Sequence, residues 1–154
     1  MNRLSSNGLG MPNILSLKAF PHCFASPYFY RLNYFLDMLL SSFIEKIKNN
    51  EPVDFNETMA VISENYQYNP TEFRNGLNED CIVNKAGENE GSCKIFAFAK
   101  LHRLDQRQTL NLFGDYYRQD VLNDPHGSGH LNIRQFMKYG WAGIDFQGEA
   151  LRPK

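Results

Sequence analysis

Hydrophobic positions repeat at helical spacing once the chain passes Met38. Leu40, Ile44 and Ile47 are three or four residues apart, with charged residues between them, which is the pattern of a helix with one apolar face. Pro52 cannot continue such a helix, because it lacks a backbone N–H and its ring clashes with the preceding turn. We therefore expect a first helix that begins near Met38 and ends before Pro52.

Two later segments carry the signature of a capped helix start. Glu57 follows Asp54 by three positions and Gln108 follows Asp105 likewise, the spacing at which a cap and the third helical residue bond reciprocally. A last short helix is expected to end at Gly140 as its C-cap. The positions expected to face the core are Phe55, Met59, Ile62 and Tyr66 in the first of these helices, Leu110, Phe113, Tyr117 and Val121 in the second, and Ile133, Phe136 and Met137 in the last.

The stretch from about Ser92 to His102 is apolar on nearly every side. Its hydrophobic residues include Ile95, Phe96, Phe98, Ala99 and Leu101. A helix with almost no polar face is normally buried, so we expect this one to be the central helix of the fold. Ser92 is a suitable N-cap, because its hydroxyl can accept one of the unpaired N–H groups of the first turn.

Short extended segments are expected on either side of the central helix. Pro70 biases the residue before it away from helix, which favours a strand over Tyr66–Asn69, and Ile144–Phe146 alternates in hydrophobicity. A brief turn is expected from Thr71 to Gly76, and residues 76–91 form a polar connection. The fold class is therefore α+β: a single, predominantly helical domain of about five helices with a few short strands.

The first 37 residues differ from the rest of the chain. Asp37 is the first acidic residue, and the many aromatic residues before it follow no clean period. Lys18 interrupts the best candidate for a secretory signal, and an organelle transit peptide fits the acid-poor composition somewhat better. We favour a third interpretation, in which Met38 is the natural start. The expected organisation is a poorly ordered extension, 1–37, and a domain, 38–154.

Composition limits the function more than it defines it. The 154 residues are 42% hydrophobic and 21% charged, with a formal net charge of −1, so no nucleic-acid partner is expected. No run is long and apolar enough to span a membrane. The three cysteines, Cys23, Cys81 and Cys93, form no CxxC pair, which favours free thiols in a reducing, cytoplasmic compartment.

Cys93 is the first candidate for chemistry. It lies in the expected first turn of the central helix beside Lys94, and both features lower the pKa of a thiol. A thiolate there could act as a nucleophile if His130 or His102 approached as a base. The alternative is a small buried side chain that packs inward and is inert, and this interpretation is favoured.

The loop before the central helix could bind an anion through its backbone N–H groups. The segment from Gly87 to Ser92 has two glycines, but it is not a Walker loop because Cys93-Lys94 follows the second glycine. A loop that only caps the helix is the simpler alternative. The Asp and His residues between Asp120 and His130 lack the fixed helical spacing of a metal site, so no metal and no cofactor are expected.

Charged and aromatic side chains follow on the next two helices. Arg118 could hold an anionic ligand in a bidentate manner, and Arg134 could do the same from the last helix. Tyr117 lies beside Arg118, with Tyr116 and Asp120 on a shared face. An ion-pair network that keeps the helices in register is at least as good an explanation.

Five motifs, taken together, are similar to the HopJ type III effector family. They are N-G at 75–76, N-x-A-G-x-N-x-G-S-C-K-I-F-A-F-A at 84–99, T-L-x-L-F-G-x-Y-Y-R-x-D-V-L at 109–122, H-x-N-I-R-x-F-M at 130–137 and G-W-x-G-I at 140–144. The resemblance extends from about Met38 to Lys154. It implies a bacterial protein, since the family is named for one delivered into host cells by type III secretion, and it brings no established catalytic mechanism.

Three functions remain open at this point. The first is a HopJ-like protein that binds a small anionic or peptide ligand. The side chains expected to line its pocket are Asn84, Asn89, Ser92, Lys94, Tyr117, Arg118, His130 and Arg134. The second is an enzyme with Cys93 as nucleophile or His130 as general acid or base. The third is a module that binds a host or bacterial protein. The sequence leaves the oligomeric state open.

Overall fold

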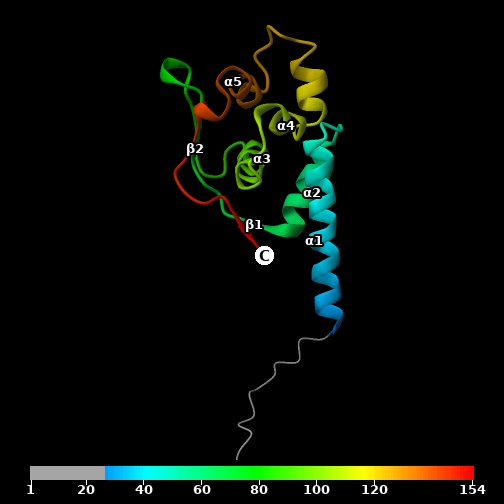
Figure 1. The fold of residues 1–154 in the computed structure, drawn as a ribbon. Coiled ribbons are helices and arrows are strands. Elements are labelled where there is room, and N and C mark those ends of the chain that lie inside the picture. The colour runs from blue at the N-terminus through cyan, green and yellow to red at the C-terminus, as the bar shows by residue number, and fades with distance from the viewer. Residues whose placement is uncertain (1–26) are drawn as a thin grey trace, which may run out of the picture.

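The computed structural model describes residues 27–154, with side chains from Asp37 onward. Helix α1 spans Pro27–Lys48, so it begins well before Met38, where the apolar pattern predicts its start. Pro27 occupies the first helical position, where a missing N–H removes no intrahelical hydrogen bond. The expectations for residues 1–26 lie outside the described part of the chain. In Figure 1, α1 runs along the outside of the domain beside α2.

The two capping boxes and the C-terminal cap at Gly140 that the sequence predicts are present. The further helical elements are α2 (Phe55–Asn65), η1 (Asn78–Asp80), α3 (Glu90–Leu101), α4 (Gln106–Asn111), the π-helical η2 (Tyr116–Val121), α5 (Leu131–Tyr139) and η3 (Gly140–Gly143). Asp54 forms a capping box with Glu57 before α2, and Asp105 forms one with Gln108 before α4. Gly140, at φ +55°, ends α5 as expected. Across the described residues, no helix is both long and apolar enough to cross a membrane.

The central helix begins earlier than its sequence suggests. Asn89, in the left-handed conformation at φ +48°, is the N-cap of α3, and Ser92 lies inside the first turn. The expectation that Ser92 caps this helix is therefore wrong. Asparagine tolerates the left-handed region better than most residues, which lets the chain turn into the helix at Asn89.

The single helix expected from Asp105 through Val121 is interrupted between α4 and η2. Gly114 has a positive φ of +59°, and a Cβ at this position would lie 2.5 Å from the backbone nitrogen of Phe55. The chain therefore breaks at this glycine, and the residues after it form the π-helical segment η2. Only glycine allows the backbone to pass so close to the start of α2.

Within residues 27–154, five short strands form two antiparallel sheets. They are β1 (Tyr66–Tyr68), β2 (Phe73–Asn75), β3 (Ile82–Asn84), β4 (Ile144–Phe146) and β5 (Leu151–Pro153). Strands β1 and β5 pair with each other, and β2 lies between β3 and β4. The extended segments expected at β1 and β4 are confirmed, while the turn expected after Thr71 is wrong because β2 occupies that stretch. The α+β class, mostly helical with a few short strands, is confirmed.

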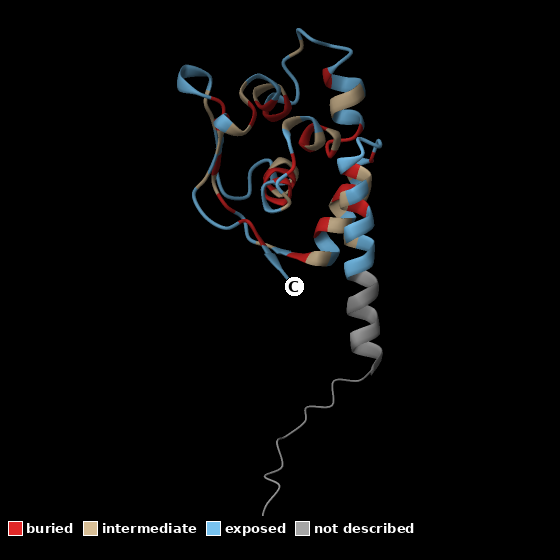
Figure 2. Cartoon of the chain, in the orientation of Figure 1, coloured by how far each residue is buried: buried red, intermediate tan, exposed pale blue. Residues whose placement is uncertain are grey.

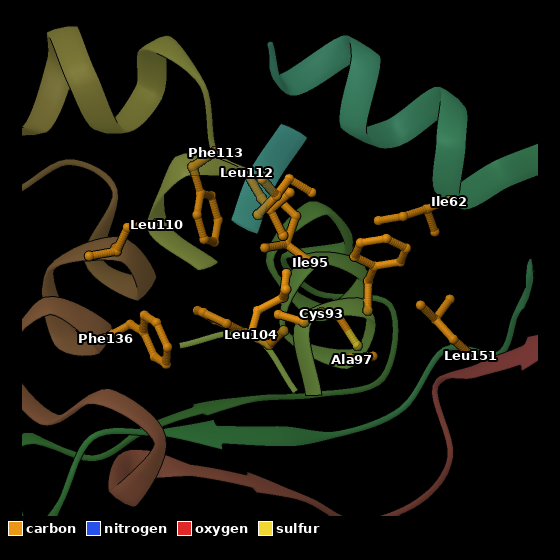
Figure 3. Packing of buried hydrophobic residues seen from close by; sticks show 14 of the residues in the cluster. Ile62, Cys93, Ile95, Ala97, Leu104, Leu110, Leu112, Phe113, Phe136 and Leu151 are labelled. Carbon is orange, nitrogen blue, oxygen red and sulfur yellow. The ribbon is translucent and has the colours of Figure 1, made fainter. Parts of the chain in front are cut away.

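Helix α3 is the centre of the hydrophobic core, as its sequence predicts. Its fully buried side chains are Cys93, Ile95, Phe96, Phe98 and Ala99. Helices α2 and α4 and strand β5 contact it, and Figure 1 shows it enclosed by the other elements. The buried residues of the fold gather around it in Figure 2, and Figure 3 shows Ile62, Leu112, Phe136 and Leu151 closing in from four other parts of the chain.

Candidate functional site

A pocket of about 550 Å³ opens where α3 and α5 begin. We call it the α3–α5 pocket. Its lining residues are Phe55 on α2, Ile82 on β3, Asn89, Gly91 and Ser92 at the start of α3, Phe113 and Tyr116 around η2, and Ser128, His130, Leu131, Asn132 and Ile133 at the start of α5. Of the residues that the sequence analysis selected, the lining includes Asn89, Ser92 and His130.

The first turn of α3 presents unpaired backbone donors at this pocket. The first hydrogen bond within the helix runs from Cys93 N to Asn89 O at 3.0 Å, so the N–H groups of Gly91 and Ser92 precede the helical ladder. Asn89 does not cap them, since its side-chain amide donates instead to Asn84 Oδ1 at 2.7 Å. These N–H groups are directed along the positive end of the helix dipole.

The first turn of α5 has the same arrangement. His130 is its N-cap in the left-handed conformation at φ +55°, and its imidazole makes no cap hydrogen bond. Ile133 N donates to His130 O at 2.9 Å as the first helical bond, which leaves the N–H groups of Leu131 and Asn132 ahead of the ladder. Two helix starts, both with uncapped donors, therefore share one pocket.

A buried asparagine network holds the two helix starts together. Asn132 on α5 donates to Asn84 Oδ1 at 2.8 Å, and its own Oδ1 accepts from Asn84 at 3.2 Å and from Asn75 at 3.1 Å. Asn84 also accepts the hydrogen bond from Asn89 at the start of α3. Asn75, Asn84 and Asn132 are all buried. Because an amide both donates and accepts, asparagines can satisfy one another in this way.

His130 stands at the edge of the pocket with a carboxylate behind it. Its Nε2 lies 3.1 Å from Asp120 Oδ2, and its ring lies 5.2 Å from the ring of Tyr116. The side chain of His130 is 36% exposed. A histidine oriented by a carboxylate can carry a proton or accept one, which is the arrangement used in acid–base chemistry.

Cys93 does not have the environment of a nucleophile. Its side chain is fully buried, and Sγ donates to the carbonyl oxygen of Thr71 at 3.6 Å. Burial raises the pKa of the Cys93 thiol, whereas a nucleophile needs a lowered one. Cys93 also lies outside the lining of the pocket, and Figure 3 shows its sulfur among the packed core side chains. Cys93 therefore lies in the buried environment of the favoured interpretation, because an apolar helix turns this residue inward, and these contacts do not support the alternative of a reactive thiolate.

Lys94 and Tyr117 also lie outside the α3–α5 pocket. Lys94 Nζ is 3.2 Å from Glu90 and 4.4 Å from the centre of the Tyr68 ring, on a different side of α3. Tyr117 is half-buried and packs against the core. Neither side chain is therefore positioned as the sequence analysis expects for a ligand contact.

The two arginines do not line the pocket, and their hydrogen bonds hold parts of the fold around it. Arg118 bonds to Asn111 and Asp115, both at 3.2 Å. Arg134 donates to three carbonyl oxygens of the turn that precedes α5, with Nε 2.7 Å from Gly129 O and Nη2 2.8 Å from Asp124 O. For both arginines the structural explanation given above describes the contacts better than an anion-binding role does.

Sequence reasoning missed Asn132, Asn75 and Phe55. Asn132 shares a helical face with Phe136, four positions later, so a polar side chain turned into the core could have been inferred there. Asn75 precedes Gly76 and was interpreted as part of a turn, which concealed its place in a strand. Phe55 was expected in the core, and nothing local indicates that its ring also reaches a pocket.

The described residues contain no group of three or more His, Cys, Asp or Glu side chains that could share a metal ion. The polar groups in the lining of the pocket are backbone N–H groups, amides, hydroxyls and the imidazole of His130. These groups can hold an anion and exchange a proton with it.

The fold and pocket define a small α+β domain built around one buried helix, with a polar pocket at the start of that helix. The family model described as HopJ type III effector protein matches residues 40–151. The chain therefore belongs to the HopJ family, which confirms the resemblance seen in its motifs. A comparison with curated proteins gave no match.

A solved structure extends the comparison to three dimensions. It is the crystal structure of VPA0580, described as a protein of unknown function. The two sequences are 48% identical, and the match covers 80% of this chain and 93% of the VPA0580 chain. The TM-score is 0.63. The similarity supports the fold and the family, and it assigns no reaction or ligand.

Proposed function

We propose that this HopJ family member binds a small anionic ligand in the α3–α5 pocket. The observation that carries the proposal is that two helix starts open on the same cavity. Each helix start carries about half a positive elementary charge, and its unpaired N–H groups are donors for an anion. The donors in question belong to Gly91, Ser92, Leu131 and Asn132.

The lining supports an anion over a cation. Among the described residues that line the pocket, none is Asp, Glu, Lys or Arg, so no acidic side chain in the lining opposes an anion at the helix starts. The volume of about 550 Å³ falls within the usual range for small-molecule sites, about 300–1,000 Å³. A peptide could present the same group through its C-terminal carboxylate.

The proposal is tested by placing a negative charge at the mouth of the pocket. Leu131 is 52% exposed at the first position of α5, where an acidic side chain favours the helix. Leu131→Glu should therefore fold normally and repel an anion, while Leu131→Gln has nearly the same shape without the charge. Backbone amide NMR with acetate, sulfate and phosphate would report binding directly.

In the wild type we expect saturable shifts at the amides of Gly91, Ser92, Leu131 and Asn132. Leu131→Gln should retain the affinity within about threefold, and Leu131→Glu should weaken it by about tenfold or more, the effect of roughly 1.4 kcal/mol of repulsion. Shifts at other sites only, or equal affinity in the two variants, would refute the proposal.

A further inference from the structure

A second pocket, also of about 550 Å³, lies where α2, β1 and α3 meet the end of the chain. We call it the α2–β1 pocket. None of its lining residues lines the α3–α5 pocket, so the two are separate sites. Its volume also falls within the range of small-molecule sites, about 300–1,000 Å³. The residues used below are Met59, Ile62, Tyr66, Tyr68, Lys94 and Lys154.

The strand pairing of β5 brings Lys154 to this pocket. In the register of β5 with β1, Pro153 is opposite Tyr66, so the next residue lies beside the end of α2. There Lys154 N donates to Asn65 O at 3.0 Å, and its ammonium group donates to Ser63 O. In Figure 1 the end of the chain lies beside β1. Lys154 is therefore held at the pocket by its backbone as well as by its side chain.

Lys94 reaches the same pocket from α3. Its Nζ lies 3.2 Å from Glu90 Oε2 and 4.4 Å from the centre of the Tyr68 ring. An ammonium group carries three N–H donors. Among the described residues, Lys94 Nζ donates to Glu90 and Lys154 Nζ donates to Ser63 O. Each lysine therefore has donors left for a ligand.

The lining combines positive charge with an apolar floor. Two of the lining side chains, Lys94 and Lys154, are cations, and none is Asp or Glu. The floor includes Ile62, which is 1% exposed, together with the partly buried Met59 and Tyr68. An inorganic anion held by the lysines would leave this floor against water. A ligand with an apolar body would cover it and gain the stabilisation of buried apolar surface.

We propose that the α2–β1 pocket binds a small phosphate monoester whose organic group is apolar. The phosphate is held by the ammonium groups of Lys94 and Lys154, and the organic group lies against Met59, Ile62 and Tyr68. A phosphate monoester carries between one and two negative charges near neutral pH and offers three acceptor oxygens, which matches two ammonium groups with unused donors. This site goes beyond the proposed function, because it shares no lining residue with the α3–α5 pocket.

The probe is phenyl phosphate, added to the full chain at about pH 7.5, where the ester is close to doubly charged. Backbone amide NMR should show saturable shifts at Tyr66, Gln67 and Tyr68. Inorganic phosphate, which lacks the ring, should bind there at least about fivefold more weakly, since it covers little apolar surface. Phenol, which lacks the charge, should give no saturable shift at these amides.

Both members of the Lys94–Glu90 ion pair provide variants, and they should act in opposite directions. Lys94→Gln and Lys154→Gln should each weaken phenyl phosphate binding by about fivefold or more, because each removes a charged donor. Glu90→Gln releases Lys94 from a competing carboxylate and should strengthen binding by about two- to fivefold, the range of an exposed ion pair. Lys100→Gln is the matched control, because Lys100 is an exposed lysine on the same helix outside this pocket.

The outcomes separate this site from the α3–α5 pocket. If phenyl phosphate shifts only the amides of Gly91, Ser92, Leu131 and Asn132, this inference is refuted while the proposed function stands. Equal losses of affinity in Lys94→Gln and Lys100→Gln would show that net charge alone is responsible and would overturn it. Weaker binding in Glu90→Gln would also contradict it, since an ion pair with only a structural role predicts losses from both partners. Equal affinity for phenyl phosphate and inorganic phosphate would refute the apolar organic group.

Discussion

Asn132 connects the pocket to the interior of the protein. Its side chain makes three hydrogen bonds to Asn75 and Asn84, at 2.8 to 3.2 Å, while its backbone N–H faces the candidate ligand site. A buried amide is costly unless its donors and acceptors are paired, so the network is stable only when all its members are present. Only the Asn75 Oδ1 atom lacks a partner among the described atoms of this network.

Removing this side chain should therefore destabilise the fold. We expect Asn132→Ala to lower the free energy of unfolding by about 2–3 kcal/mol, because it removes three hydrogen bonds from a buried amide network, although Asn75 keeps its bond to the backbone oxygen of residue 132 and Asn84 keeps its bond from Asn89. Urea unfolding followed by the fluorescence of Trp141, which packs against Phe136, measures this loss. Asn123→Ala removes an exposed amide contact and should change stability by less than about 0.5 kcal/mol. Equal effects of the two substitutions would contradict the role of the network.

At the residue scale, the sequence predicted well which residues lie near the helix starts. It predicted less well the directions in which their side chains point. Asn89, Ser92 and His130 line the pocket because a polar residue beside a helix start has few other places to lie. Arg118 and Arg134 have long side chains, whose direction depends on acceptors distant in sequence, such as the carbonyl groups of the turn before α5. No local pattern encodes those acceptors.

At the scale of elements, the junction between α4 and η2 depends on one close backbone approach. Gly114 passes the start of α2 with a positive φ, and a Cβ there would lie 2.5 Å from Phe55 N. This contact places η2, and with it Tyr116 and Asp120, beside the pocket. The position of Tyr116 in the lining of the pocket is therefore linked to a glycine that lies outside it.

Gly114→Ala should destabilise the protein by about 3 kcal/mol or more, since left-handed strain of about 1 kcal/mol adds to a backbone clash. Gly87→Ala is a matched control. Gly87 also has a positive φ, of +90°, but nothing lies within 4 Å of an added Cβ. It should show the strain alone, a loss of about 1 kcal/mol. Thermal unfolding of both variants tests the difference, and similar losses would show that the close approach to Phe55 N is unimportant.

The elements that the sequence predicted best are those with a local signal. Capping boxes and apolar periodicity identified α2, α4 and α5, because the interactions that define them lie within a few residues. Strand β1 was predicted from Pro70 and β4 from its alternation, whereas in β2, β3 and β5, which are equally short at three residues each, the sequence analysis found no such signal. The break at Gly114 was missed because its cause, the start of α2, is remote in the chain.

At the scale of the whole molecule, α3 connects two polar sites through an apolar core. Its first turn opens on the candidate ligand pocket, and its C-cap residue, His102, lies at the opposite end. His102 Nε2 and the Tyr66 hydroxyl are 2.7 Å apart, and the His102 ring is 4.4 Å from that of Phe98. The sequence predicted the central position of this helix because its residues from Ile95 to Ala99 are all apolar. It did not predict the partner of His102, which is supplied by strand β1.

Burial of His102 should make the stability of the whole domain depend on pH. Burial, and to a lesser extent the charge of Lys48, lowers the pKa of His102 below its ordinary value. The unfolded chain, in which a histidine titrates near pH 6.5, therefore binds more protons than the folded chain just below that pH. The stability that neutral His102 contributes is present above about pH 6.5 and is lost as the pH falls toward the folded pKa.

The measurement is urea unfolding at intervals from about pH 7.5 to about pH 5, the range in which histidine titrates. The free energy of unfolding should fall as the pH falls. The slope should correspond to the uptake of at most one proton on unfolding. His102→Gln keeps a partner for the Tyr66 hydroxyl and removes the titrating group, so it should flatten this slope even if it is less stable throughout. His126→Gln, at an exposed position, should retain the slope. If His102→Gln and the wild type lose stability in parallel, carboxylates rather than this buried imidazole set the acid sensitivity of the fold.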